Sequence, residues 1–352
     1  MNTYQCACGS RLFFENTKCL KCAREVGWCR TCQSIRAAEP TEAQTFACTV
    51  CSTSLVKCHN YEVEKVCNRF VSADMANGEA VTLCRSCQFT KDIPDLNIEG
   101  NRRRWYRLER GKRRLFYTLD YLQLPYGLEG EGVEPPLSFH FKADPGAETR
   151  NWRPLRGQQQ VYTGHAHGKI TINLREADPA EREKLRVNLQ EEHRTIIGHF
   201  RHEIAHYYWE MLVQGKAEDA FIEVFGDHNN PSYADAMKNY YDNGPAADWT
   251  RSFVSAYASM HPWEDFAETF ASYLDLVSVL ETAANMGLGE VIDPRTTELK
   301  PMLKRYQRIG VVLNEMNRDM GLKDLVPEVF VPPVAQKMRY VHDLVRASAS
   351  GN

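Results

Sequence analysis

Twelve cysteines lie within the first 87 residues of this 352-residue chain, and the remaining 265 residues contain none. Most form close pairs with one or two residues between them, so that both thiolates can face one tetrahedral zinc ion. Taken in order, they predict three four-sulfur sites: Cys6, Cys8, Cys19 and Cys22; Cys29, Cys32, Cys48 and Cys51; Cys58, Cys67, Cys84 and Cys87. Closed sites of this kind are structural, so this region should fold around zinc rather than perform chemistry.

Disulfides are the alternative use of these cysteines, and they would need an oxidising compartment. The segment 1–6 lacks the basic and apolar regions of a secretory signal, and no apolar run approaches the ~18 residues of a membrane span. We therefore expect zinc sites in a cytoplasmic protein that does not bind membranes. In the third site Cys58 and Cys67 are nine residues apart, and His59 is a competing nitrogen ligand.

A net charge of -3 gives no global preference for nucleic acid, but residues 101–114 carry eight basic side chains and one acid. Arg102, Arg103 and Arg104 beside Trp105 could contact phosphates and stack on bases. Leucines at helical spacing favour a different interpretation. In it the segment is a helix between modules, and its charges are solvated or pair with acids of the following domain.

The segment from Glu191 to Val213 has the apolar periodicity of a helix. His202 and His206 are one turn apart on it, so both can bind one zinc ion, and Glu203 projects toward the open side of the metal. The chemistry implied is metal-assisted hydrolysis of a peptide bond, with Glu203 as the general base and later the proton donor to the leaving amine.

Such a site needs a third ligand. Trp209 and Leu212 stand where the metzincin pattern has a glycine and a histidine, which excludes that family. A second amphipathic helix is predicted at residues 261–271, with Glu264 and Glu268 on one face.

This arrangement resembles the gluzincin peptidases, the thermolysin-like clan. The resemblance implies that Glu264 ligates zinc and that Glu268 supports a histidine ligand, as carboxylates beside zinc-bound imidazoles usually do. Asp265 points elsewhere on the helix and is a weaker choice.

Tyr257 lies seven residues before Glu264, a spacing that also occurs in anthrax lethal factor, where the corresponding tyrosine helps to stabilise the oxyanion. We take Tyr257 as a hydrogen-bond donor to the tetrahedral intermediate, with an ordinary half-buried tyrosine as the alternative. His261 is a further possible donor, although a histidine before a proline at a helix start can be local structure.

A β-branched strand is predicted at residues 169–174, after a turn flanked by His165 and His167. Zincin enzymes pair an extended substrate with an edge strand beside the active-site helix, so Ile170 and Ile172 are expected to line the substrate backbone. The two flanking histidines are weak metal-ligand candidates because the helix already supplies a histidine pair.

The cysteine module and five further segments resemble a bacterial family of zinc-binding metallopeptidases with an N-terminal zinc ribbon. The segments are Ile93–Leu96, Lys112–Leu115, Thr171–Asp178, Arg194–Trp209 and His261–Glu268. The resemblance spans nearly the whole chain and implies a zinc-dependent endopeptidase. Two features depart from the family pattern: Ser272 replaces a histidine, and the second cysteine set is additional, which suggests an enlarged recognition module.

We therefore expect an α+β protein in three parts. Residues 1–98 form the zinc-ribbon module, residues 99–125 a basic helical joint, and residues 126–348 a mainly helical zincin-like domain with a small antiparallel or mixed sheet. One alternative is a SprT-like, nucleic-acid-associated protease with His228 as third ligand. Another is a zinc-dependent regulator that binds DNA or a partner without proteolysis, although Glu203 is intact.

Overall fold

The structure is a computed structural model that describes residues 1–42, 45–76, 82–144, 161–188 and 194–350. Contacts between residues divide the chain into two compact units. The first comprises Met1–Arg114, Phe139–Tyr162 and Ile172–Asp178, and the second Leu115–Ser138, Thr163–Thr171 and Pro179–Asn352. The sequence-based boundaries divide the chain by composition alone, whereas these units combine segments that are distant in sequence.

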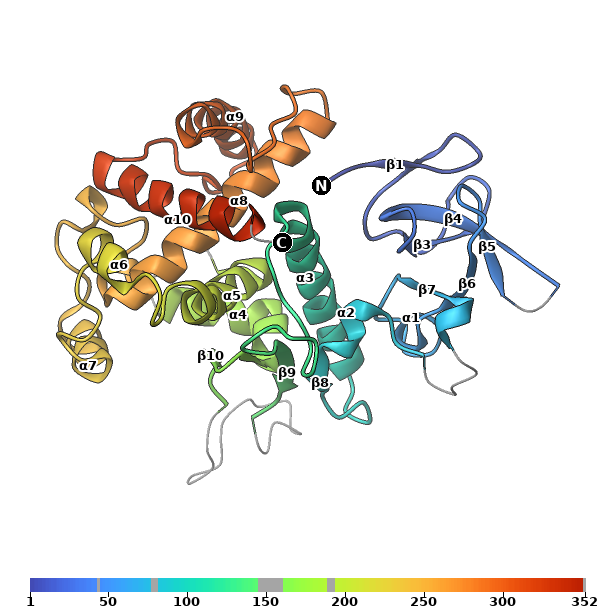
Figure 1. Cartoon of the computed structure of the whole chain (residues 1–352), viewed down its shortest axis with the longest axis horizontal. Helices are drawn as coiled ribbons and strands as arrows, with labels where there is room; N and C mark the ends of the chain where they lie inside the picture. Colours follow the sequence, from blue (N-terminus) through green and yellow to red (C-terminus); the bar gives the residue numbers. More distant parts are fainter. Residues whose placement is uncertain (43–44, 77–81, 145–160, 189–193, 351–352) are drawn as a thin grey trace. The chain divides into compact units, whose positions relative to one another are not determined.

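The first unit contains a small sheet of antiparallel strands in the order β3-β4-β5-β6-β7, preceded by the hairpin β1-β2 (Figure 1). The strands are β1 (Tyr4–Gln5), β2 (Arg11–Leu12), β3 (Glu25–Cys29), β4 (Ser34–Pro40), β5 (Phe46–Cys48), β6 (Ser54–Lys57) and β7 (Phe70–Ser72). The apolar core around them is small and mixes Leu55, Tyr61 and Phe70 with cysteines. A core of this size rarely holds a fold by itself, which is why such modules use metal.

Short elements complete this module before a long helix begins. They are α1 (His59–Glu62), a 3-10 turn (Ala73–Ala76), α2 (Arg85–Gln88) and β8 (Thr90–Asp92). The helix α3 (Asn101–Leu122) buries Leu108, Leu115, Leu119 and Leu122, the leucines whose spacing predicts it. The strand β8 pairs in parallel with β9 (Ser138–Lys142).

The strands β10 (Gly164–Ala166) and β11 (Lys169–Asn173) form a tight hairpin. His167 and Gly168 connect them with positive φ angles of 48° and 72°, the combination that a two-residue type I′ turn requires. A Cβ at Gly168 would lie 2.1 Å from the Pro136 carbonyl oxygen, so no other residue fits there.

Helices dominate the second unit: α4 (Pro179–Asn188), α5 (Ile196–Leu212), α6 (Glu218–Phe225), α7 (Tyr233–Asn243), α8 (Pro262–Asn285), α9 (Leu299–Asp319) and α10 (Pro332–Ser350), with 3-10 turns at Trp249–Arg251 and Tyr257–Ser259. A further 3-10 turn, Leu174–Ala177, belongs to the first unit. The expected α+β class, a helical domain after a cysteine-rich module, is confirmed. Among the described residues, no helix is both long and apolar enough to cross a membrane.

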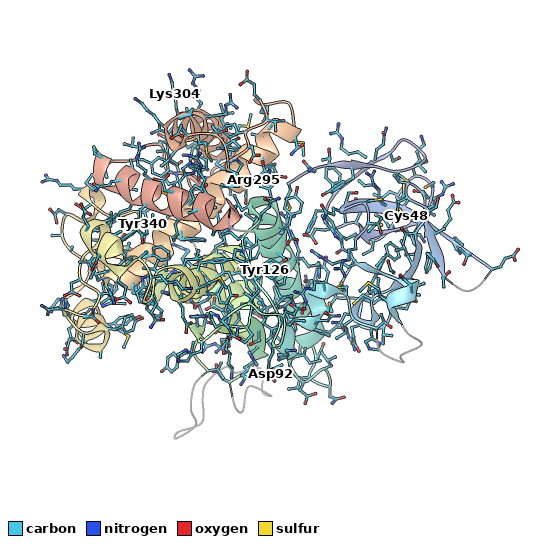
Figure 2. The ribbon with its side chains drawn as sticks, viewed as in Figure 1. Cys48, Asp92, Tyr126, Arg295, Lys304 and Tyr340 are labelled. Atoms are coloured by element: carbon cyan, nitrogen blue, oxygen red, sulfur yellow. The ribbon has the colours of Figure 1, made fainter. Side chains whose placement is uncertain are left out.

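The helices α5 and α8 pack against each other at the centre of the second unit (Figure 1). Each has an apolar face, and Tyr208 of α5 stacks on Phe270 of α8 with ring centroids 5.4 Å apart. On α10, Tyr340 packs edge-on against Phe225 of α6 (Figure 2). The packing of Tyr208 on Phe270 joins the two central helices, and the polar residues on them gain defined positions.

Candidate metal centre

The helix α5 carries the histidine pair and begins at Ile196, where the Thr195 side chain accepts a hydrogen bond from Gly198 N–H. That cap satisfies one free N–H of the first turn. The helical segment was expected from Glu191, which lies outside the described residues. His206 and Glu203 are buried, and His202 is half-buried.

The helix α8 begins at Pro262, and the side chain of His261 caps it by accepting from Trp263 N–H at 3.1 Å. Proline is well suited to this first position because its missing N–H would have no partner in the helix. One turn later, the carboxylates of Glu264 and Glu268 face α5, four residues apart as predicted. For His261, the capping bond supports the local-structure interpretation.

The side chains of His202, His206 and Glu264 bring three atoms together. The two Nε2 atoms are 3.1 Å apart, and Glu264 Oε2 lies 3.0 Å from the first and 3.4 Å from the second. Zinc bonds of about 2.0–2.1 Å in a tetrahedron would separate ligands by about 3.3–3.4 Å. The observed triangle therefore has the dimensions of one face of such a tetrahedron.

The proton positions support a cation at this point. His202 Nδ1 lies 2.6 Å from Glu268 Oε1, and because a carboxylate only accepts, Nδ1 carries the proton. In the neutral ring, Nε2 then presents a lone pair toward Glu264 Oε2, which is also an acceptor. Two acceptors 3.0 Å apart need a proton or a metal ion between them, so the donor set fits zinc.

Further contacts hold these side chains in place. Glu268 accepts from the Ser255 hydroxyl at 2.7 Å through its second oxygen. The ring of His206 packs on Trp263, with centroids 3.8 Å apart. Burial alone would raise the pKa of Glu264, but His206 and His202 hold that pKa well below its usual range. The pKa of Glu268 is lowered by His202 in the same way, against burial, so both acids are carboxylates.

Two tyrosines complete this side of the centre. The Tyr233 hydroxyl, at the first residue of α7, donates to Glu264 Oε1 at 2.8 Å. The Tyr257 ring lies 6.0 Å from that of His202, between centroids. Burial raises the pKa of both phenols, and Glu264 raises each further, so both hydroxyls keep their protons and can donate.

A buried ion pair anchors the segment that carries Ser255 and Tyr257. Lys337 of α10 donates to the Ser252 carbonyl at 2.8 Å and contacts Asp265 Oδ2 at 2.6 Å. Burial raises the pKa of Asp265 to about 6, and the nearby lysine opposes this rise. Asp265 therefore has a structural partner on α10, consistent with its expected direction away from the metal.

Replacing Lys337 with Met is expected to lower the free energy of unfolding by about 3–5 kcal/mol, because Asp265 would remain buried without its cation. Urea unfolding at pH 7, followed by tryptophan fluorescence, measures this change. The double variant Asp265→Asn, Lys337→Met removes both charges and should recover part of the loss. A double variant no more stable than Lys337→Met would contradict the ion-pair explanation.

The other candidate histidines are not members of the triangle, although the ring of His165 stacks on that of His206 with centroids 6.5 Å apart. His228 packs against Trp209 and Phe221, with ring centroids 5.1 and 5.6 Å apart. The side chain of His165 is 2% exposed, its Nε2 accepts from Gly168 N–H at 3.0 Å, and burial lowers its pKa to about 3. Among the described residues, the potential metal-binding group with histidines comprises only His202, His206 and Glu264.

The prediction of an edge strand at Ile170 and Ile172 was wrong. Their strand β11 is paired on both sides, in the sheet order β10-β11-β9-β8, and their side chains are 0% and 1% exposed. The edge of this sheet beside α5 is β10, within the described residues. Alternation identifies a strand, but its place in the sheet depends on pairing with segments far along the chain.

The cysteine sulfurs meet in three groups of four, which are the groups that their order in the sequence predicts. Sulfur–sulfur distances within the groups are 3.6 Å in the first, 3.7 and 3.8 Å in the second, and 3.7 Å in the third. A zinc tetrahedron with bonds of about 2.3 Å has edges of about 3.8 Å, whereas a disulfide bond is about 2.0 Å long. Cys48 of the second group is labelled in Figure 2.

The third group is the most deeply buried. Cys58 and Cys84 precede α1 and α2, and all four of its cysteines are buried, whereas each other group has two that are partly exposed. Arg113 of α3 is 1% exposed, donates to the Val66 carbonyl at 2.7 Å and interacts electrostatically with the Cys67 thiolate. His59 is outside the group, so the group consists of thiolates alone.

The basic residues of α3 have acidic partners in the structure. Arg102 pairs with Glu64, and three further arginines lie within 4 Å of Glu15: Arg110, Arg113 and Arg114. These two acids belong to the cysteine module, whereas Asp178, which Arg104 contacts at 3.5 Å, belongs to the segment predicted as the following domain. Trp105 is 1% exposed, so it cannot stack on bases. Nucleic-acid binding through Arg102, Arg103 and Arg104 stays a prediction that rests on arginines alone.

Sequence reasoning did not single out Tyr233 and Ser255, which donate to the two carboxylates. Both are hydroxyl residues in segments without a motif, and they meet the centre only through the packing of α7 and α8. The one available signal was the position of Ser232-Tyr233 at a helix start, since serine is a preferred cap.

Comparisons with known proteins agree with the two parts of the chain. A family described as "putative zinc-binding metallo-peptidase" matches residues 101–344, and one described as "zinc-ribbon domain" matches residues 3–98. Uncharacterised proteins of Mycobacterium tuberculosis and Mycobacterium bovis are 34% identical over 98% of this chain and 95% of their own lengths. No solved structure matches the chain.

Proposed function

This chain belongs to the putative zinc-binding metallo-peptidase family, and we propose that it is a zinc-dependent endopeptidase of the gluzincin type. Its residues His202, His206 and Glu264 would hold the catalytic zinc. The observation that carries the proposal is a triangle of three atoms 3.0–3.4 Å apart: two Nε2 atoms from α5, the helix that also bears Glu203, and one carboxylate oxygen of Glu264 from α8.

Zinc held by three protein ligands acts as a Lewis acid on a carbonyl group and lowers the pKa of water to about 7. Glu203, adjacent to the first ligand and 7% exposed, accepts the proton of the water that attacks the scissile carbonyl. The carbon–nitrogen bond then breaks as Glu203 passes this proton to the leaving amine. The negative charge of Glu203 contributes to the raised pKa of Tyr233.

Tyr257 supplies the hydrogen bond for the charge that develops on the substrate oxygen. Its ring lies beside that of His202, and its raised pKa keeps the donor proton in place at neutral pH. A preorganised donor in a partly buried site stabilises such a charge more than water does. Within the part of the chain that the structure describes, β10 is the edge strand next to α5, and an extended substrate backbone could pair with it.

The zinc ribbons would bind three structural zinc ions and serve substrate recognition or regulation. Four zinc ions per chain is therefore the expected content, one catalytic and three structural. Contact with nucleic acid through Arg102, Arg103 and Arg104 together with the zinc ribbons is a secondary proposal. If it is correct, the protein should bind nucleic acid with an affinity that falls steeply as the salt concentration rises, and replacing these arginines with neutral residues should abolish the binding.

The SprT-like alternative assigns the third ligand to His228. Against it, His228 packs on Trp209 and Phe221, whereas Glu264 lies within 3.4 Å of both ligand nitrogens and has a supporting donor of its own. The gluzincin assignment therefore has the better geometry.

Paired substitutions discriminate between the two ligand sets. Glu264→Ala is expected to reduce zinc from four ions per chain to three and to abolish cleavage, because two histidines alone hold zinc weakly. His228→Ala should retain all four. Inductively coupled plasma mass spectrometry on the full chain, purified without chelators, measures the content. Four ions in Glu264→Ala and three in His228→Ala would replace our assignment with the alternative.

A further inference from the structure

Glu264 uses its two carboxylate oxygens differently. Oε2 faces the two histidine nitrogens, while Oε1 accepts the hydrogen bond of Tyr233 at 2.8 Å. A glutamate ligand can bind a metal through one oxygen or through both. An oxygen that already accepts a short hydrogen bond is a poorer second ligand, because the bond occupies one of its two lone pairs and draws electron density away from the metal.

The position of Tyr233 is closely defined. It is the first residue of α7, where the Ser232 hydroxyl accepts from Asp235 N–H at 3.2 Å. Its ring packs edge-on against His261 at 5.2 Å and Trp263 at 5.6 Å, between centroids. These contacts come from the start of α8, which also carries Glu264. Ring and carboxylate are therefore held by the same turn of helix.

Catalytic zinc sites keep one coordination position open for water and substrate, whereas closed sites are structural. Binding through both carboxylate oxygens would fill or distort that position. We propose that Tyr233 is a positioning residue that holds Glu264 to coordination through Oε2 alone and thereby keeps the fourth position open. This inference rests on Glu264 being a zinc ligand, as the proposed function states.

Tyr233→Phe is the direct test, because it removes the hydroxyl and keeps the ring that packs on His261 and Trp263. With cobalt in place of zinc, the visible spectrum of the site reports coordination number, since five-coordinate cobalt absorbs more weakly than four-coordinate cobalt. The spectrum is taken as the difference from Glu264→Ala, so that absorption by the cysteine sites cancels.

We expect Tyr233→Phe to retain its metal, to show weaker visible absorption, and to lose about 10–100-fold in kcat with little change in KM. Tyr241→Phe is the matched control. It removes a phenol from the same helix at a side chain that is 59% exposed, and it should leave spectrum and kcat unchanged.

An unchanged cobalt spectrum in Tyr233→Phe would overturn the inference, whatever happens to kcat. If Tyr233→Phe fails to hold cobalt, 3-fluorotyrosine at position 233 retains a donor and should preserve the four-coordinate spectrum; an altered spectrum would then overturn it. Failure of the proposed function can be distinguished from failure of this inference. In that case the wild-type protein would bind cobalt with the expected spectrum yet cleave no peptide.

Discussion

Replacing Glu203 with Gln is expected to lower kcat/KM by about 10²–10⁴-fold while zinc content stays at four ions per chain. Gln has the size and shape of Glu but cannot accept a proton from water at neutral pH. Because Glu203 lies on α5 between the two histidines without joining their triangle, the metal ligands should be undisturbed.

The measurement has two parts. Mass spectrometry of new protein N-termini in cells expressing wild type or Glu203→Gln identifies the cleaved proteins. Peptides spanning the cleavage sites then give kcat/KM for both purified proteins. Equal cleavage by the two proteins would refute the general-base role. Absence of any wild-type-specific cleavage would instead support the regulator that binds DNA or a partner without proteolysis.

Cys67→Ser is expected to unfold the cysteine module, because structural zinc contributes roughly 10–16 kcal/mol to the folding of small zinc domains. The third group is buried on all sides, and Arg113 lies buried beside its thiolates. Loss of this zinc would leave a small core without its metal and weaken the interaction of buried Arg113 with the thiolates, although Arg113 also contacts Glu15 at 3.5 Å.

Hydrogen exchange with mass spectrometry measures the effect as lost protection across β3 to β7. Cys22→Ser in the first group is the matched control. Cys22 is partly exposed, and its group lies at the hairpin β1-β2, so lost protection should be confined to about the first 25 residues. Protection of β3 to β7 that survives Cys67→Ser would show that the sheet folds without its third metal.

Spacing along the sequence was enough to predict the cysteine pairs of the zinc-ribbon module and the histidine pair of α5. Cysteines two residues apart can face one ion, and histidines at i and i+4 must share a helix face, whatever surrounds them. The pair Glu264 and Glu268 follows the same rule on α8. The 3.6-residue period of the helix and the tight turn between paired cysteines determine these features, and each involves only a few neighbouring residues.

Other features of the site depend on contacts between segments far apart in the chain. Tyr233 and Ser255 carry no sequence pattern, and they reach the two carboxylates because α7 and the segment before α8 pack beside them. Trp105 was a candidate for base stacking until the fold buried it. The identity of a side chain gives its chemistry, but exposure and partner are set by the packing of the whole unit.

The sequence by itself determined the three sets of four cysteines and the helix that carries the histidine pair. It also determined the resemblance to the zinc-binding metallopeptidase family. Only the tertiary structure decided that, among the described residues, β10 rather than β11 is the edge strand, and that His228 packs against Trp209 while Glu264 meets both histidines. The reason is physical. Periodicity fixes which residues share a face of one element, whereas strand order and the meeting of two helices depend on burying apolar surface over long range.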